Sequence, residues 1–378
     1  MLIRSDCLHF RGDRPCAPHK RTGVHCDVCA EYTKTAYRIL IVKLDAIGDV
    51  LRTTCILTAL HKQWPASHVT WLTRQSAKAL FNGNPHVHRV ETVEAEAWIS
   101  LATEQYDLVI NLDSSPVSAR LATMANAERK FGFGYDPRGF VFPFNKEARE
   151  WFEMGLFDDR KLQNEKTYQT IAHEICQLDP VEQRLHLYLN DDEREWAKQQ
   201  RESWGGHHRQ PVIGLNTGAS DRWPHKKWTL EGYVELINGL YPYLQEKHGV
   251  EPLIVLLGGE SERERNKEIV ARTHGRSVDA RTDRELRRFF ALLELCDLVV
   301  TGDTLGMHAA CALDKFVVAI FGPTSITEID LYGRGVKLVS DAPCVGSYLS
   351  DCDVTPTCME RISSEQVQRA VLQLLGYC

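Results

Sequence analysis

A carboxylate follows a glycine at a point where an apolar run gives way to a helical pattern. The run "RILIVKL" (38–44) reads as a buried strand, and "DAIGDV" comes directly after it, so Gly48 and Asp49 occupy a strand-to-helix turn. Glycine at such a turn lets a ligand approach the backbone closely. Asp49 is therefore either a helix-start carboxylate favoured by the helix dipole or part of a functional site.

A second polar group lies in "NTGASDRWPHKKW" (216–228), again between an apolar run and a helical pattern. Backbone N–H groups and the hydroxyls of Thr217 and Ser220 could surround a phosphate there, and one of the nearby lysines, Lys226 or Lys227, could supply the countercharge. The composition therefore suits a phosphate site. The alternative is a solvated turn, since lysines at helix starts usually face water.

A third group is "TGDTLGMHAA" (301–310), which also follows an apolar run and opens a helix. Asp303, Thr304 and His308 would project from this turn toward the same interdomain cleft as the residues above. A lone histidine in such a position is more often structural than ligand-binding, so His308 keeps both interpretations.

A fourth group, "LLGGESERER" (256–265), places Glu260 at the end of an apolar run. Carboxylates at this position of an α/β sheet can hold ribose hydroxyls. The pattern makes Glu260 a candidate for binding a nucleotide.

The elements that must position these groups are short apolar runs that alternate with helical patterns. Continuous apolar strands alternating with helices indicate parallel sheets that are covered on both faces. A polar stretch at 190–210 separates two sets of runs, which predicts two doubly wound α/β domains. Ligands of such sheets bind at the carboxyl ends of the strands, where every candidate above lies. The runs are 38–44, 68–73, 107–113, 211–218, 252–259, 298–303 and 316–322.

Length and composition agree with this organisation. The chain has 378 residues, 43% hydrophobic and 25% charged, which is ordinary globular usage and enough for two domains. The net charge of −6 gives no bias toward nucleic acid. No apolar run approaches the roughly 20 residues that cross a bilayer, and the first residues lack the apolar region of a signal peptide. We therefore expect a cytoplasmic protein.

Cysteines are frequent, with twelve in the chain. Four near the N-terminus have the spacing C-x8-C-x9-C-x2-C, and four thiolates suit structural Zn²⁺ or an iron–sulfur cluster. The alternative is an N-terminal arm with reduced thiols. The predicted ligands are Cys7, Cys16, Cys26 and Cys29, with His9, His19 and His25 as substitutes. Three more cysteines could join them in space: Cys344, Cys352 and Cys358.

Four motifs, in order along the chain, resemble the glycosyltransferase family 9, the ADP-heptose:lipopolysaccharide heptosyltransferases. The resemblance runs from about Arg38 to the C-terminal helix. The motifs are "ILIVKLDAIGDVLRTT", "NTGAS" followed by "KKW", "TGDTLGMHAACALDKFVVAIFGPTS" and "CMERISSEQV". Asp45 and Ala46 stand where the family often has small hydroxyl residues, and Leu305 replaces a usual glycine. These departures concern acceptor recognition and the donor phosphate loop.

The resemblance implies a GT-B fold, an α/β architecture of two Rossmann-like doubly wound domains that face a central cleft. It implies that the acceptor binds the N-terminal domain, that the nucleotide-sugar binds the C-terminal domain, and that catalysis needs no metal. We expect the helix that ends the chain, capped by Ser363 and Gln366, to pack back on the N-terminal domain. The expected divisions are a Cys-rich segment (1–35), an acceptor domain (36–195), a donor domain (196–360) and the terminal helix (361–378).

The activity implied by the resemblance is inverting transfer of a heptose from a nucleotide-activated donor, expected to be ADP-heptose. The acceptor would be a hydroxyl of a lipopolysaccharide-type or other glycan, with peripheral contact at the cytoplasmic face of the inner membrane. Asp49 would be the general base. The donor site would comprise Gly48, Thr217, Ser220, Lys226, Glu260, Asp303, Thr304, Gly306 and His308. The alternatives are another sugar, a protein acceptor, or a metal-bearing binding protein on an inactive transferase scaffold.

Overall fold

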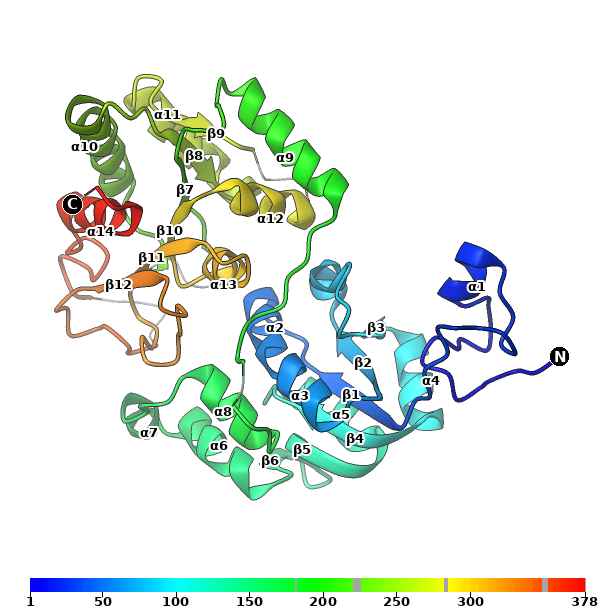
Figure 1. Cartoon of the computed structure of the whole chain (residues 1–378). Coiled ribbons are helices and arrows are strands. Elements are labelled where there is room, and N and C mark those ends of the chain that lie inside the picture. The colour runs from blue at the N-terminus through cyan, green and yellow to red at the C-terminus, as the bar shows by residue number, and fades with distance from the viewer. Residues whose placement is uncertain (181, 220–225, 282–284, 349–352, 378) are drawn as a thin grey trace. The chain divides into compact units, whose positions relative to one another are not determined.

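The computed structural model describes residues 1–180, 182–219, 226–281, 285–348 and 353–377. These residues form two compact units, each built around one six-stranded sheet (Figure 1). The prediction of two α/β domains is thus confirmed. The first unit comprises Met1–Ala46, Thr53–Glu153 and Thr170–Gln183, and the second comprises Ile47–Arg52, Met154–Gln169 and Arg184–Cys378.

The first sheet has the strand order β3-β2-β1-β4-β5-β6. Its strands are parallel except β6, which runs antiparallel to β5. Strand β2 is buried along its whole length, as expected for a parallel strand covered on both faces. The strands are β1 (Tyr37–Val42), β2 (Ser67–Thr73), β3 (Arg89–Thr92), β4 (Gln105–Asn111), β5 (Asn126–Asp136) and β6 (Phe140–Pro143).

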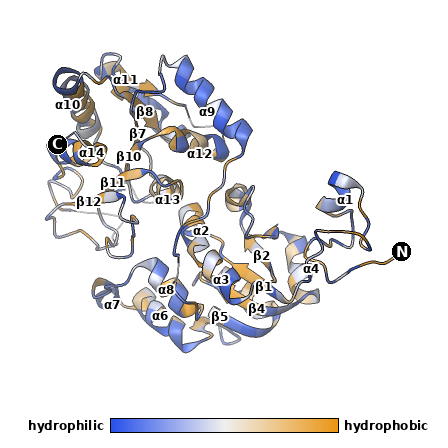
Figure 2. Ribbon diagram, in the orientation of Figure 1, coloured by the Kyte–Doolittle hydropathy of each residue, from blue (hydrophilic) through white to orange (hydrophobic). Residues whose placement is uncertain are grey.

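The second sheet has the order β12-β11-β10-β7-β8-β9, and all of its pairs are parallel. Read from β9, this order is the same doubly wound order as in the first sheet. Figure 2 shows apolar residues along the central strands and polar residues on the outer helices such as α9. The strands are β7 (Val212–Asn216), β8 (Leu253–Leu257), β9 (Val278–Asp279), β10 (Leu298–Gly302), β11 (Phe316–Phe321) and β12 (Gly335–Val339).

Helices connect the strands in both units. In the part of the chain that is described, no helix combines the length and apolar character needed to cross a membrane. The helices are α1 (Ala17–Thr22), α2 (Ile47–Thr53), α3 (Leu57–Gln63), α4 (Ala95–Thr103), α5 (Pro116–Met124), α6 (Arg149–Leu156), α7 (Asp158–Leu162), α8 (Tyr168–Ile175), α9 (Asp191–Ser203), α10 (Leu230–His248), α11 (Arg263–Arg272), α12 (Leu286–Leu295), α13 (Leu305–Ala312) and α14 (Ser364–Leu375).

The terminal helix α14 has the predicted capping box. Gln366 N donates to Ser363 Oγ at 3.3 Å, and Ser363 N donates to Gln366 Oε1 at 2.9 Å. The sequence predicts that this helix packs on the N-terminal domain, whereas the structure places its apolar stripe in the core of the second unit. Val367 and Val371 are fully buried there, because the stripe completes the cover of the second sheet beside α10.

The boundary between the units also differs from the expected division at residues 195 and 196. Helix α9 packs on α12 of the second unit, and Arg287 pairs with Glu193 at 2.6 Å. The first unit therefore ends at Gln183. The N-terminal segment 1–35 belongs to the first unit and is not a separate domain.

Candidate functional site

A largely buried lysine–carboxylate pair lies at the carboxyl end of β10. Lys226 Nζ is 2.8 Å from Asp303 Oδ2, and Thr324 Oγ1 donates to the same oxygen at 2.8 Å. Burial alone would raise the pKa of Asp303, but Lys226 and then His308 bring it below its ordinary value. The carboxylate is therefore ionised and holds the lysine in place.

A glycine at the end of β10 allows the segment that carries Lys226 to approach Asp303. A Cβ at Gly302 would collide with the carbonyl oxygen of Lys226, so only glycine permits the observed backbone approach. The end of β10 and the segment carrying Lys226 are thus in direct backbone contact. This contact could not be read from the local sequence of either segment.

His308 lies on α13 next to the pair. Its Nε2 is 4.0 Å from Asp303 Oδ1, and the residue is 8% exposed. Burial lowers the pKa of His308 to about 4, although Asp303 opposes this shift. The imidazole is neutral at pH 7, so it offers one N–H donor and one acceptor and carries no charge.

The start of α13 presents backbone N–H groups at the same sheet edge. Thr304 is the N-cap, and its Oγ1 accepts from Gly306 N at 3.2 Å. Asn216, at the end of β7, donates to Thr304 Oγ1 at 3.0 Å. Strands β7 and β10 are neighbours at the point where the strand order reverses, which is where α/β sheets bind ligands. A helix start in this position favours an anion.

Gly48 and Asp49 lie at the start of α2, and this part of α2 belongs to the second unit. A Cβ at Gly48 would come within 3.2 Å of His308 Cδ2 and 3.4 Å of the Leu305 Cα atom. The glycine therefore lets α2 approach α13 closely. Asp49 follows Gly48 and is near enough to His308 to favour its charged form, and its side chain remains 37% exposed.

Arg52 is a residue of the site that the sequence reasoning missed. Its Nε is 2.8 Å from Asp49 Oδ1, its Nη1 is 3.7 Å from Glu328 Oε2, and its guanidinium lies 4.0 Å from the Tyr168 ring centroid. Burial opposes the charge, but Asp49 and Glu328 raise the pKa of Arg52 above its usual value. The i,i+3 spacing of Asp49 and Arg52 on a helix could have indicated the pair.

Glu328 gains its position from contacts that are distant in sequence. Tyr348 Oη donates to Glu328 Oε1 at 2.9 Å, and Tyr168 N donates to the Glu328 carbonyl at 2.9 Å. No local pattern around Glu328 signals this role.

Two predicted donor-site residues are engaged elsewhere. Thr217 is buried, and its Oγ1 donates at 2.6 Å to Oδ1 of Asn266, a buried residue of α11. Glu260 is largely exposed and pairs with Arg263 at 3.0 Å. Ser220 lies outside the described residues. The structure therefore brings together Gly48, Asp49, Lys226, Asp303, Thr304, Gly306 and His308.

A buried carboxylate next to Glu260 was also missed. Glu262 is 3% exposed, pairs with Lys227 at 2.8 Å and accepts from Gly259 N at 3.0 Å. It therefore holds the loop after β8 to the segment that carries the two lysines.

The cysteines of the N-terminal segment are half-buried free thiols. Within the described ranges, no three His, Cys, Asp or Glu side chains are arranged to hold a metal ion. The site predicted at Cys7, Cys16, Cys26 and Cys29 is not assembled here and stays a prediction. Cys344 and Cys358 are buried in the core of the second unit, and Cys352 lies outside the described residues.

Comparisons with known proteins agree with this architecture. Residues 95–348 match glycosyltransferase family 9 (heptosyltransferase). The lipopolysaccharide core heptosyltransferase OpsX of Haemophilus influenzae is 20% identical over 299 residues, covering 77% of this chain and 80% of OpsX. A glycosyl transferase family 9 structure from Veillonella parvula matches with a TM-score of 0.74 at 22% identity, covering 90% of this chain and 98% of that one. The structure of Escherichia coli ADP-heptose lps heptosyltransferase II matches with a TM-score of 0.63 at 20% identity, covering 89% and 98%. These structures establish the fold as GT-B.

Proposed function

Because the chain belongs to glycosyltransferase family 9, we propose that it transfers heptose from ADP-heptose, with inversion, to a hydroxyl of a lipopolysaccharide-type glycan. The family makes the protein a glycosyltransferase. The names of OpsX and of the Escherichia coli enzyme support the choice of donor and acceptor. The observation that carries the proposal is the group of Lys226, Asp303 and His308, against which α2 packs at Gly48, the residue before Asp49.

On the donor side, the diphosphate would lie at the start of α13. The N–H groups of this helix start and the Lys226 ammonium would stabilise the negative charge that develops on the leaving diphosphate. Asp303 holds Lys226 in the ground state at 2.8 Å. Neutral His308 would donate its N–H to the donor without adding charge.

On the acceptor side, Asp49 would act as general base. The acceptor oxygen attacks the anomeric carbon and forms the new C–O bond while its proton passes to the Asp49 carboxylate. The bond between the anomeric carbon and the diphosphate oxygen breaks, and ADP leaves with the electron pair. Attack opposite the leaving group inverts the anomeric configuration.

The test is a comparison of donors with the full-length chain. We expect heptose transfer from ADP-heptose to a lipopolysaccharide core acceptor that lacks heptose, and much slower transfer from UDP- or GDP-sugars. The Asp49→Asn variant should bind ADP-heptose normally yet transfer about 10²–10⁴-fold more slowly, the usual contribution of a general base.

The controls separate the parts of the proposal. Asp107→Asn removes a carboxylate at the amino end of β4 and should leave transfer unchanged. Near-normal turnover of the Asp49→Asn variant would show that Asp49 is not the general base. Transfer from a UDP- or GDP-sugar in preference to ADP-heptose would overturn the donor assignment.

A further inference from the structure

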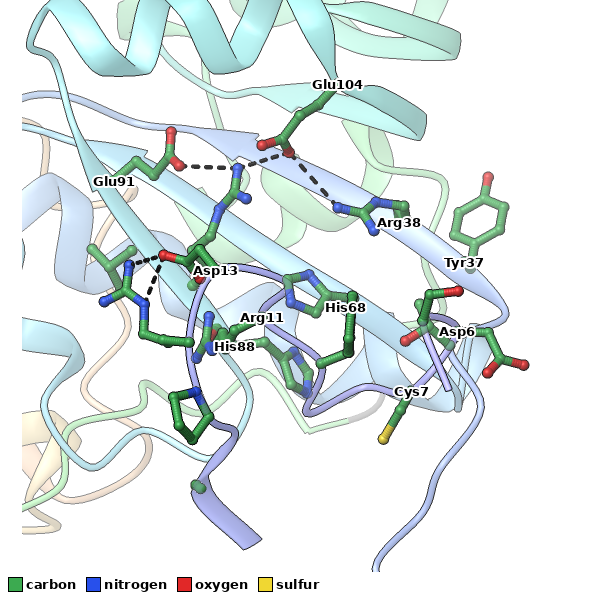
Figure 3. A pocket seen from close by; sticks show the side chains of 18 of the residues that line it. Asp6, Cys7, Arg11, Asp13, Tyr37, Arg38, His68, His88, Glu91 and Glu104 are labelled. Carbon is green, nitrogen blue, oxygen red and sulfur yellow. Dashed lines mark hydrogen bonds and ion pairs between the residues drawn. The ribbon is translucent and has the colours of Figure 1, made fainter. Parts of the chain in front are cut away.

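A large cavity lies at the amino ends of strands of the first sheet. Its volume is about 1470 Å³, and it opens between the N-terminal segment and the amino ends of β1, β2, β3 and β4 (Figure 3). Asp49 follows the carboxyl end of β1. The cavity is therefore a separate feature, and no part of the proposed transfer uses it.

The cavity wall is rich in charge and has a cationic excess. Seven Lys and Arg side chains face five Asp and Glu side chains, although the chain as a whole has a net charge of −6. The cations are Arg11, Arg14, Lys20, Arg21, Arg38, Lys78 and Arg89, and the carboxylates are Asp6, Asp13, Glu91, Glu104 and Asp107.

The carboxylates already have partners. Arg89 lies 2.9 Å from Glu91 and 2.8 Å from Glu104. Asp13 pairs with Arg14 at 2.7 Å. The remaining two accept hydrogen bonds: Asp6 from Tyr32 Oη at 2.9 Å, and Asp107 from Arg38 N at 2.5 Å. These contacts reduce the repulsion that the carboxylates would exert on an entering anion.

Three cations have no carboxylate within ion-pair distance among the described residues. Arg11 donates to the carbonyl oxygen of His88 at 3.1 Å and pairs with no acid in the part of the chain that the structure describes. Lys20 and Lys78 are exposed, line the cavity from α1 and from the turn after β2, and form no ion pair with any described residue. Their charges are available to a ligand.

A buried histidine in the same wall has an unused polar atom. His68 is 9% exposed, and its Nδ1 has no hydrogen-bond partner among the described residues. Its ring stacks on His88, with ring centroids 5.1 Å apart. A buried polar atom without a partner is costly, so such an atom at a cavity wall indicates a missing partner.

The electrostatics of the wall point in the same direction. Burial, and then His88, Arg38, Arg89 and Arg11, lower the pKa of His68 to about 3. Three of these neighbours are arginines, whose positive charges disfavour protonation of the imidazole. The wall is therefore a region of positive potential that favours an anion.

We propose that this cavity binds a phosphate-bearing ligand, with Arg11, Lys20 and Lys78 on its oxygens and a neutral His68 donating from Nδ1. A phosphate group has several acceptor oxygens and two negative charges, which match three cations and one N–H donor. The volume exceeds what one phosphate ion fills. It suits a phosphorylated sugar, a nucleotide or a lipid headgroup, which share this chemistry.

The first test measures pyrophosphate binding by calorimetry, using the full chain with Lys226→Ala to remove the proposed donor phosphate site. We expect binding that weakens at least about tenfold when Lys20→Ala and Lys78→Ala are added together, the loss typical of charge-assisted hydrogen bonds. The matched control is Lys62→Ala, an exposed lysine of α3 that does not line the cavity. Absence of binding, or an equal loss with Lys62→Ala, would overturn the proposal.

A second experiment distinguishes a lipid headgroup from a small phosphorylated ligand. Vesicles of equal parts phosphatidylglycerol and phosphatidylcholine are sedimented with the wild-type chain and with the Lys20→Ala/Lys78→Ala variant. Co-sedimentation that the variant loses identifies a lipid headgroup. Pyrophosphate binding without co-sedimentation identifies a small phosphorylated ligand.

The proposal is independent of the transfer reaction. The Lys20→Ala/Lys78→Ala variant should retain heptose transfer to a soluble acceptor, and Asp49→Asn should retain pyrophosphate binding. Loss of transfer with unchanged pyrophosphate binding in the double-lysine variant would contradict the separate phosphate site.

Discussion

At the residue scale, the central feature is that the Lys226 charge is shared with a buried carboxylate. Asp303 orients the ammonium and would compete with donor phosphate for it. A lysine free in solvent would cost more entropy to order on binding. Pre-orientation by Asp303 therefore places the charge where the leaving diphosphate needs it.

Lys226→Ala should weaken donor binding about 10–100-fold, the range expected for a lost hydrogen bond to a charged group. Calorimetry with ADP-heptose checks this value. Lys227→Ala is the matched control, because it also removes the partner of a buried carboxylate, Glu262 at 2.8 Å. Equal losses of donor affinity in both variants would show a general effect on the loop.

Arg52→Lys should lower kcat about tenfold and leave the donor KM unchanged. Lysine keeps the charge but not the planar fork that spans Asp49 and Glu328, so the carboxylate of Asp49 would lose its orientation. Steady-state kinetics separate the two parameters. Arg74→Lys, which alters an exposed pair with Asp45, serves as control. A rise in KM alone would mean that Arg52 acts on the donor.

At the element scale, helix starts and glycines bring distant segments together. Gly48 lets α2 approach α13, and Gly302 lets β10 contact the backbone that carries Lys226.

The N-terminal segment shows the opposite situation: its cysteines are spaced for a metal, yet the described residues do not assemble a site. Metal binding would have to gather these thiolates, so it would order the segment.

Replacing Cys26 and Cys29 by serine should release bound metal, lower the melting temperature and leave measurable transferase activity. Elemental analysis of the natively purified protein and calorimetric melting check this. Cys296→Ser, a buried thiol of the second unit, provides the comparison for an ordinary core cysteine. Native protein without zinc or iron would eliminate the metal site.

At the scale of the whole molecule, histidines that are wholly or partly buried make stability depend on pH. Burial lowers the pKa of His68 to about 3 and of His88 and His308 to about 4, whereas an unfolded histidine titrates near 6.5. Between these values the unfolded chain binds more protons than the folded chain. Acid therefore favours unfolding in both units.

We expect the free energy of unfolding to be constant with respect to these histidines above about pH 6.5 and to fall as the pH drops from about 6.5 to 4. Urea unfolding at a series of pH values measures this slope. His88→Gln should reduce the slope, and His208→Gln, at an exposed position, should not change it. A slope that His88→Gln leaves unchanged would contradict the prediction.

The sequence alone determined the central strands and the turns that carry the candidate site residues. All seven apolar runs form strands, because the interior of a parallel sheet requires continuous apolar residues. Strands β3, β5, β6, β9 and β12 were not predicted, since outer strands are less buried and their sequences are correspondingly mixed.

Only the tertiary structure decided which of the candidate residues share a site. Asp49 lies early in the chain but belongs to the second unit, where it meets Arg52 and approaches His308. Glu260 and Thr217 fit the local pattern equally well, yet Glu260 pairs with nearby Arg263 and Thr217 is hydrogen-bonded to Asn266 of α11. Local sequence specifies strand, turn and helix, whereas contacts between distant segments depend on packing distances that no local pattern encodes.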